Sequence, residues 1–183
     1  MISEIKKEQR KTAIQKRQEL SLEERQKGSV QICRAIEALP FFSDAKCILS
    51  YFASYDEADP SFLNLDGKKV CYPISYADGI MKAAVPIQDN GLVIGRFGIK
   101  SPDENTAAFV DPKDIDLVIV PCVAFDENKK RLGHGKGYYD RYLKNCTNAH
   151  IICIAFEAQK LGDVATDEFD IPMECIVTEK KIY

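Results

Sequence analysis

The residues best suited to chemistry in this chain are concentrated in the segment 129–142. It contains the run Gly-His-Gly-Lys-Gly, whose glycines occupy alternate positions 133, 135 and 137. Its charged side chains include Arg131, Lys136, Asp140 and Arg141. Glycines let backbone N–H groups approach a ligand without a Cβ in the way. Phosphate is the ligand that binds both N–H groups and cations, and an accompanying metal ion would bind the carboxylate. The segment therefore predicts a nucleotide-phosphate loop.

Other interpretations of this segment stay open on the residues alone. Glycines also cluster in loops for geometric reasons, so the segment is compatible with a turn that carries solvated lysines. Its spacing is neither that of a Walker loop nor that of the dinucleotide-binding fingerprint. Asp140 is a candidate for Mg²⁺, for an ion pair with Arg141 or Lys136, or for a turn cap.

Five further residues are candidates at other places in the chain. Lys6 and Arg10 are four positions apart and hence neighbours on a helix face, where a polyphosphate would offset their repulsion. The alternative is a solvated face, because acidic residues are interleaved with the lysines there. Glu57 could accept two N–H bonds from a polar heterocycle, or be a solvated loop acid. Phe97 could stack on a ring or belong to the core, and Asp170 could bind a metal or cap a helix.

Composition excludes several classes of function. The 183 residues suffice for one domain with a sizeable core. Net charge is −3, so no global basic field exists to hold nucleic acid. No apolar run approaches the roughly 20 residues of a spanning helix, and the first residues lack the apolar core of a signal peptide. Seven scattered cysteines and two histidines do not form a zinc pattern, so we expect buried thiols in a reduced, cytoplasmic protein.

The order of helical and strand patterns predicts an α/β fold. We expect a helix over 4–20 with Ser3 as N-cap, and a second helix from the Ser21–Glu24 capping box to Leu39, stopped by Pro40. Strands are predicted at 47–52, 69–72, 81–85, 116–121, 151–155 and 175–178. A hairpin should join 123–125 to 130–132, and a helix should begin near Gly137. Because 116–121 is apolar on both faces, we expect a three-layer α/β/α sandwich around a largely parallel, mixed sheet, in a single domain over 1–183.

Taken together, the motifs resemble the 5-formyltetrahydrofolate cyclo-ligase family, also called 5,10-methenyltetrahydrofolate synthetases. The resemblance covers nearly the whole chain. Its most specific part is Arg131-Leu-Gly-His-Gly-Lys-Gly-Tyr-Tyr-Asp-Arg141. The other segments, in order, are Lys6-x-x-x-Arg10 with Leu20-Ser21, Tyr51-Phe52 with Glu57, Phe97-Gly98-Ile99 with Pro102, and Phe169-Asp-Ile-Pro172 with Ile176-Val-Thr-Glu179. Lys100 departs from the family, in which proline is common at that place.

The resemblance implies roles for individual residues. ATP would be bound by Lys6, Arg10, Arg131, Leu132, Gly133, His134, Gly135, Lys136, Gly137, Tyr138 and Tyr139. The folate would be bound by Phe52, Glu57, Phe97, His134, Gly135, Lys136, Gly137 and Tyr138. The resemblance makes Lys136, Arg131 and Tyr138 the candidate catalytic residues and Asp140 and Asp170 the Mg²⁺ ligands.

The expected reaction is ATP-dependent conversion of 5-formyltetrahydrofolate to 5,10-methenyltetrahydrofolate, with release of ADP and phosphate. The sequence shows no recognisable Ser/His/Asp or Cys/His pattern, which is consistent with a substrate that supplies its own nucleophile. The expected partners are two small molecules, without nucleic acid or membrane, and the expected state is a monomer. The alternatives are a nucleotide- or sugar-phosphate-binding protein on a similar sandwich, because fold does not fix function, and an RNA-binding module, which the acidic composition disfavours.

Overall fold

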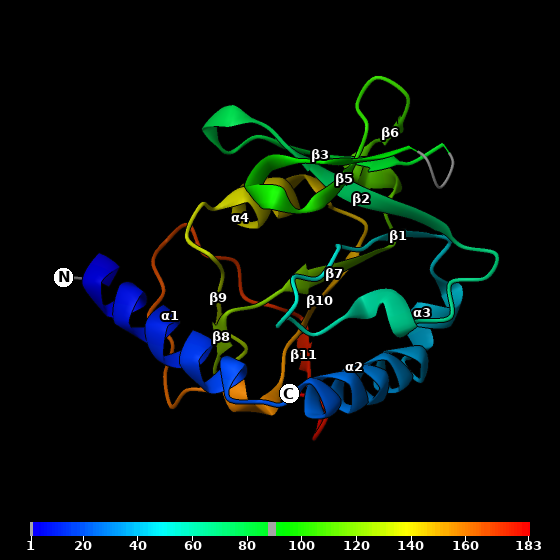
Figure 1. Ribbon diagram of the computed structural model, residues 1–183. Coiled ribbons are helices and arrows are strands. Elements are labelled where there is room, and N and C mark those ends of the chain that lie inside the picture. Colours follow the sequence, from blue (N-terminus) through cyan, green and yellow to red (C-terminus); the bar gives the residue numbers. More distant parts are fainter. Residues whose placement is uncertain (1, 88–90) are drawn as a thin grey trace.

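A mixed sheet forms the centre of the computed structural model, which describes residues 2–87 and 91–183. The strand order within the described residues is β11-β10-β7-β1-β2-β3-β6 (Figure 1). The strands are β1 Cys47–Leu49, β2 Lys69–Ser75, β3 Met81–Val85, β6 Ala108–Val110, β7 Leu117–Pro121, β10 His150–Ile154 and β11 Cys175–Val177. Pairing is parallel from β11 to β2 and antiparallel from β2 through β3 to β6. The predicted largely parallel, mixed sheet is confirmed.

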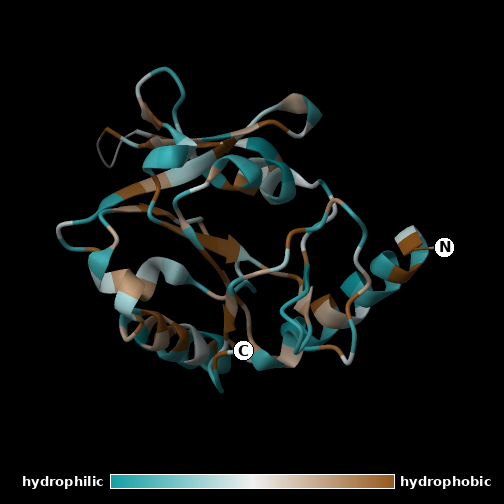
Figure 2. Cartoon of the chain, turned by 180° about the vertical axis from the view of Figure 1, so that it is seen from behind, coloured by the Kyte–Doolittle hydropathy of each residue, from teal (hydrophilic) through white to brown (hydrophobic). Residues whose placement is uncertain are grey.

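Both faces of the sheet are covered, as the predicted sandwich requires. Because alternate side chains of a strand point to opposite faces, each central strand contributes to two cores. Ile48, Leu117 and Ile119 pack in the core that also holds side chains of α2 (Leu22–Glu37) and α3 (Pro40–Asp44). Leu49, Val118 and Val120 pack in the core shared with α4 (Tyr138–Tyr142) and the 3₁₀ turn Leu143–Asn145. Apolar residues accordingly concentrate on the central strands, and the outer helix faces are hydrophilic (Figure 2).

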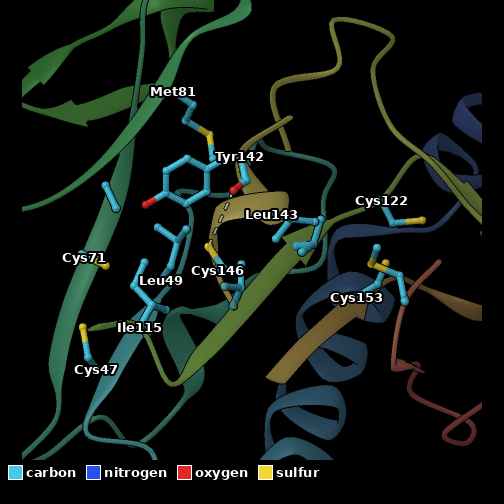
Figure 3. Close-up of a cluster of buried hydrophobic side chains, with 14 of the residues drawn as sticks. Cys47, Leu49, Cys71, Met81, Ile115, Cys122, Tyr142, Leu143, Cys146 and Cys153 are labelled. Carbon is cyan, nitrogen blue, oxygen red and sulfur yellow. Dashed lines mark hydrogen bonds between the residues drawn. The ribbon is translucent and has the colours of Figure 1, made fainter. Parts of the chain in front are cut away.

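The core beneath α4 is rich in sulfur. Tyr142 and Leu143 pack among Met81, Leu49 and Cys146 (Figure 3). All seven cysteines are free thiols; six are buried and Cys175 is half-buried. The prediction that they act as small buried hydrophobes is confirmed for those six, and burial raises the pKa of the Cys146 thiol to about 11.

The first helix, α1 (Ile2–Gln18), lies along one end of the sheet beside a short hairpin of β8 (Ala124–Phe125) and β9 (Arg131–Leu132) (Figure 1). Ala13 of α1 packs against this hairpin. The predicted hairpin is therefore confirmed. Ser3 is not the N-cap, because the helix already includes Ile2 and places Ser3 inside its first turn.

The second helix begins as predicted and ends two residues early. The Ser21 Oγ accepts from the Glu24 N–H at 3.2 Å, and the Glu24 carboxylate accepts from the Ser21 N–H at 2.7 Å. The helix ends at Glu37 rather than Leu39. Pro40 does not simply stop it; Pro40 begins α3, where a first-turn proline needs no N–H partner.

Several strands were missed or misjudged in length. The predicted strand 47–52 ends at Leu49, and the strand predicted over 69–72 continues to Ser75. The edge strand β6 was not predicted, nor was the hairpin of β4 (Leu92–Ile94) and β5 (Lys100–Pro102). Each of these segments has only three residues, which is too short for a period to be recognised, although Leu92–Ile94 and Ala108–Val110 are apolar throughout. Across the described residues, no helix combines the length and apolar character needed to cross a bilayer.

Candidate active site

One cavity of about 1160 Å³ receives every residue that the sequence singled out for binding or catalysis. It lies beyond the carboxyl ends of β1 and β7, which are neighbours in the sheet although the chain leaves them for opposite sides. Ligands of open α/β sheets bind at such switch points. The lining residues among the predictions are Lys6, Arg10, Phe52, Glu57, Phe97, Arg131 to Asp140, and Asp170.

The backbone of the glycine loop adopts conformations that favour glycine. Gly135 has a φ of 90° and Gly137 a φ of 66°, in the region where a side chain is strained. The Arg10 Nε donates to the Gly133 carbonyl at 2.7 Å, so α1 holds the loop from one side. Burial lowers the pKa of Arg10, and the charge of Asp170 opposes that shift only partly.

Arg131 is buried at the start of this loop. Its Nη1 donates to the Pro121 carbonyl at 3.1 Å, and its Nη2 donates to the Asp140 carboxylate at 3.0 Å. Burial is the largest single effect and lowers the pKa of Arg131, but the charge and hydrogen bond of Asp140, together with Cys153 and Cys122, raise the pKa above its ordinary value. Of the ion-pair partners considered for Asp140, neither Arg141 nor Lys136 is used. Arg141 instead donates to the Lys136 carbonyl at 2.5 Å.

Lys6 is buried on α1 between two carboxylates of a late loop. Its Nζ lies 2.5 Å from Asp170 and 2.7 Å from Asp167. Burial lowers the pKa of Lys6, but the hydrogen bonds and charges of both carboxylates outweigh it and raise the pKa. The interpretation of Lys6 as part of a solvated helix face is wrong. Asp140 and Asp170 thus line one cavity, and each accepts a bond from a cation expected to meet phosphate.

Glu57 is buried in the loop after β1. Its Oε2 accepts from the Ser54 N–H at 2.9 Å, and its Oε1 lies 3.0 Å from the His134 Nε2 and 3.9 Å from the Arg17 Nη1. Burial raises the pKa of Glu57, but the hydrogen bonds from His134 and Ser54 and the charges of His134 and Arg17 prevail and lower the pKa. A solvated loop acid is therefore excluded. A charged acceptor faces the cavity instead.

Aromatic side chains form part of the cavity wall. Phe52 stacks on Tyr72 with ring centroids 4.1 Å apart. Phe97, at the tip of the β4–β5 hairpin, is 57% exposed and meets the Tyr138 ring edge-on at 6.0 Å, so it does not belong to the core. The Tyr138 hydroxyl donates to the Tyr76 carbonyl at 2.7 Å. The hydroxyl of Tyr138 is thus occupied by backbone, and its ring is the part that meets Phe97.

Two buried polar atoms in the cavity wall have no hydrogen-bond partner among residues 2–87 and 91–183. They are the Tyr139 hydroxyl and the Arg131 Nε. Burial raises the pKa of Tyr139 although Arg131 opposes the shift, so the hydroxyl keeps its proton at neutral pH. Buried polar groups normally have partners. These two atoms are covered by protein and do not themselves form the surface of the cavity.

The sequence interpretation missed several residues of this region. Asp167, Arg17 and Asp56 lie at or directly behind the cavity wall, and none of them was a candidate. A signal for Arg17 was present, because it lies seven positions beyond Arg10 and shares its helix face. For Asp56 and Asp167 the only signal was proximity in sequence to predicted residues.

Comparison with known proteins identifies the group to which this chain belongs. Residues 2–179 match the 5-formyltetrahydrofolate cyclo-ligase family. The chain is a member of that family. It is 28% identical to the 5-formyltetrahydrofolate cyclo-ligase of Escherichia coli over 178 residues, which covers 92% of this chain and 97% of the relative.

Solved structures of family members have the same fold. The 5,10-methenyltetrahydrofolate synthetase of Aquifex aeolicus is 34% identical with a TM-score of 0.83, and the match covers 97% of this chain and 91% of that one. The synthetase of Mycoplasma pneumoniae is 28% identical with a TM-score of 0.76, covering 95% and 98%. The family and fold implied by the sequence motifs are confirmed.

Proposed function

We propose that this protein converts 5-formyltetrahydrofolate and ATP to 5,10-methenyltetrahydrofolate, ADP and phosphate. Family membership supports the reaction. The observation that carries the proposal for this chain is that a single cavity contains both halves of a site. One half is a glycine loop with cations, and the other is a buried carboxylate beside aromatic rings. The first suits a nucleotide's phosphates and the second a pterin-like heterocycle.

ATP is proposed to bind with its phosphates on the glycine loop. Backbone N–H groups between Leu132 and Tyr139 would contact phosphate oxygens, and Lys6, Arg10 and Arg131 would neutralise them. All three cations line the cavity, and Lys6 and Arg131 are held by carboxylates that an anionic ligand would replace. Lys136 is exposed on the same loop and forms no side-chain ion pair within the described residues, so its ammonium is free to meet the γ-phosphate.

Magnesium is proposed to accompany ATP through Asp140 and Asp170. No group of three acidic, histidine or cysteine side chains suited to a metal occurs in the described part of the chain. Mg²⁺ commonly uses one or two carboxylates together with water and phosphate oxygens, so two carboxylates on the wall of the phosphate cavity fit it. When bound, the ion would neutralise charge that develops on the transferring phosphoryl group.

The folate is proposed to bind between Phe52 and Phe97, with its heterocycle N–H groups on Glu57. An ionised carboxylate accepts two parallel N–H bonds, and Glu57 is held in the ionised form. The His134 Nε2 now lies on one of its oxygens and would have to move for the folate to bind. Phe52 is fixed by its stack on Tyr72, whereas Phe97 is exposed at a hairpin tip and free to close over a ring.

The proposed reaction needs placement more than covalent help from protein. The formyl oxygen attacks the γ-phosphorus in line, the bond to the β-phosphate oxygen breaks and ADP departs. N10 then bonds to the activated formyl carbon and loses its proton to solvent, and phosphate leaves with the former formyl oxygen. Cations and N–H groups that surround the phosphoryl group stabilise charge as it develops. Arg131, Lys136 and the glycine-loop amides would have this role, and the Tyr138 ring would position the folate beside them.

The test is an absorbance assay, because the methenyl product absorbs where the formyl substrate does not. Protein, Mg²⁺, ATP and 5-formyltetrahydrofolate should yield this band with one ADP per product, and omission of ATP should abolish it. A non-hydrolysable ATP analogue serves as the matched control. Nucleotide binding by calorimetry without any product band would contradict the proposal and favour a phosphate-binding protein without cyclo-ligase activity.

We also infer that residues 1–183 act as one domain, as a monomer in the cytoplasm, on these small molecules alone. The cavity supports a single-chain unit because it draws its walls from α1, the β1 loop, the glycine loop and the late loop of the same chain. Light scattering of the purified protein, with and without both substrates, should give the mass of one chain.

A further inference from the structure

The buried face of α1 carries cations where an ordinary helix would carry apolar residues. Lys6, Arg10, Ala13 and Arg17 are spaced as one stripe of a helix, and Lys6, Ala13 and Arg17 are buried. Lys6 and Arg10 reach the phosphate half of the cavity. Arg17, two to three turns further along, does not reach the cavity and lies behind Glu57 in the opposite half of the wall. A buried charged side chain is costly, so its contacts indicate what it is for.

Arg17 is bonded to one carboxylate and lies beside a second. Its Nη2 and Nε donate to Asp56 Oδ2 at 2.9 and 3.2 Å. Its Nη1 lies 3.9 Å from Glu57 Oε1 and has no hydrogen-bond partner among the described residues. The side chains of all three residues are at most 7% exposed. Asp56 therefore fixes the guanidinium, and the remaining edge of the guanidinium faces the carboxylate proposed to bind the folate.

We propose that Arg17 is a positioning residue that keeps Glu57 ionised and aimed into the cavity, and so sets the affinity for the folate. This inference rests on the proposed function, in which Glu57 accepts N–H bonds from the heterocycle. Arg17 does not line the cavity, so it acts through Glu57 rather than on the substrate.

The charges around Glu57 explain why the arginine is needed. The groups that face Glu57 are Arg17 from α1, the adjacent Asp56, His134 of the glycine loop, and the hydroxyls of Tyr51 and Tyr139. When the folate displaces His134, Arg17 still places a positive charge beside Glu57. Without Arg17, two neighbouring buried carboxylates would face each other, and one would take up a proton. A protonated Glu57 is a donor at one oxygen and can no longer accept two N–H bonds.

The central experiment compares four variants by calorimetry with 5-formyltetrahydrofolate and by steady-state kinetics. Arg17→Met should raise the folate Kd and KM by roughly tenfold or more and leave the ATP KM unchanged. This is the loss expected when the folate N–H groups no longer have an ionised Glu57 as hydrogen-bond acceptor. The ratio of the folate Kd of this variant to that of wild type should increase as pH is lowered from about 8.5 to about 6, because Glu57 gains its proton in the variant. Arg17→Lys should recover most of the folate affinity, because lysine keeps the positive charge although it lacks the planar N–H donors of the guanidinium.

Asp56→Asn is the matched control. It removes the charge of the same ion pair and should lower stability as Arg17→Met does. Its amide oxygen can still accept from the guanidinium, so the cation stays beside Glu57 and the folate Kd should stay within about twofold. The double variant Arg17→Met/Asp56→Asn removes both charges and is expected to fold even if Arg17→Met does not. It should still bind the folate weakly, because burial raises the pKa of Glu57 and the charge of Arg17, which lowers it, is gone.

Three results would overturn the proposal. They are an equal loss of folate affinity in Asp56→Asn and Arg17→Met, near-normal affinity in the double variant, and no rescue by lysine. Calorimetry keeps this test apart from the proposed function. If wild type binds the folate without converting it, the proposed reaction fails and the Arg17 comparison still stands. If wild type does not bind the folate, both proposals are wrong.

Discussion

The Arg131 guanidinium and the Asp140 carboxylate lie 3.0 Å apart in the wall of the cavity. A cation proposed for phosphate and a carboxylate proposed for Mg²⁺ therefore neutralise each other. Lys6 and Asp170 repeat the arrangement at 2.5 Å from different parts of the chain. Binding of nucleotide alone would leave two carboxylates without their cations. Binding of metal alone would leave two cations without their carboxylates. We therefore expect ATP and Mg²⁺ to bind cooperatively.

Asp140→Asn should expose this dependence in stability. The side chain of Arg131 is 4% exposed, so loss of its carboxylate should lower the free energy of unfolding by about 2–4 kcal/mol. Metal-free ATP should then raise the melting temperature of the variant more than that of wild type, because a phosphate replaces the missing anion. Urea unfolding and thermal melts in chelator measure both effects. Asp114→Asn, at an exposed position, is the control, and equal ATP shifts in Asp140→Asn and wild type would contradict the exchange.

Periodicity and capping were enough to predict the architecture. The buried run of β7 and the capping box at Ser21 are local patterns that the structure confirms. Lys100–Pro102 and Ala108–Val110 were missed because edge and hairpin strands owe their pairing to neighbours, not to a pattern of their own. The spacing of glycines and cations in 129–142 predicted where an anion-binding loop would lie. The identity of the expected ligands, ATP, Mg²⁺ and a folate, came from the family resemblance.

The sequence could not predict which charged residues pair across the site. Lys6 meets Asp170 over a separation of 164 residues, and His134 meets Glu57 over 77. Such contacts depend on the sheet order, which brings the ends of β1 and β7 together. For this reason the sequence left Asp140 with three candidate partners, and the structure gave it a fourth, Arg131.

Gly135→Ala should impair nucleotide binding beyond its effect on stability. A Cβ at this position would lie 3.1 Å from the Arg10 guanidinium, and φ is 90°. We expect a loss of stability of roughly 1–2 kcal/mol from the backbone and at least a tenfold rise in the ATP KM from the displaced arginine. Gly67→Ala is the matched control, with a φ of 75° and open space around it. It should lower stability similarly and leave the ATP KM unchanged. Equal kinetics in the two variants would refute the role of the Gly135–Arg10 contact.

Glu57→Gln should reveal the depressed pKa of Glu57 in acid unfolding. The folded carboxyl has a pKa below its ordinary value of 4.5, so the folded state binds fewer protons than the unfolded state. The carboxylate therefore contributes stability that is present above about pH 4.5 and lost as pH falls through the folded pKa. The difference in unfolding free energy between wild type and variant should be constant from pH 5 to 7, on the order of 1–3 kcal/mol, and shrink below that range. Urea titrations at each pH measure it, and a difference that grows in acid would contradict the sign. Glu23→Gln, in an exposed ion pair, should show no such change.

Lys136→Ala should lower turnover without lowering stability. The residue is exposed, and its ammonium forms no ion pair within the described residues, so truncation should change the free energy of unfolding by less than about 0.5 kcal/mol. If the ammonium meets the γ-phosphate as charge develops, kcat and kcat/KM for ATP should fall together by roughly a hundredfold. The methenyl absorbance assay and urea unfolding give the two readouts, and Lys113→Ala, an exposed lysine that does not line the cavity, controls for the loss of one positive charge. Unchanged kcat would rule out a transition-state contact, and a rise in the ATP KM alone would mean that Lys136 binds ground state and transition state equally. The phosphoryl charge would then depend on Arg131, Lys6 and the loop amides.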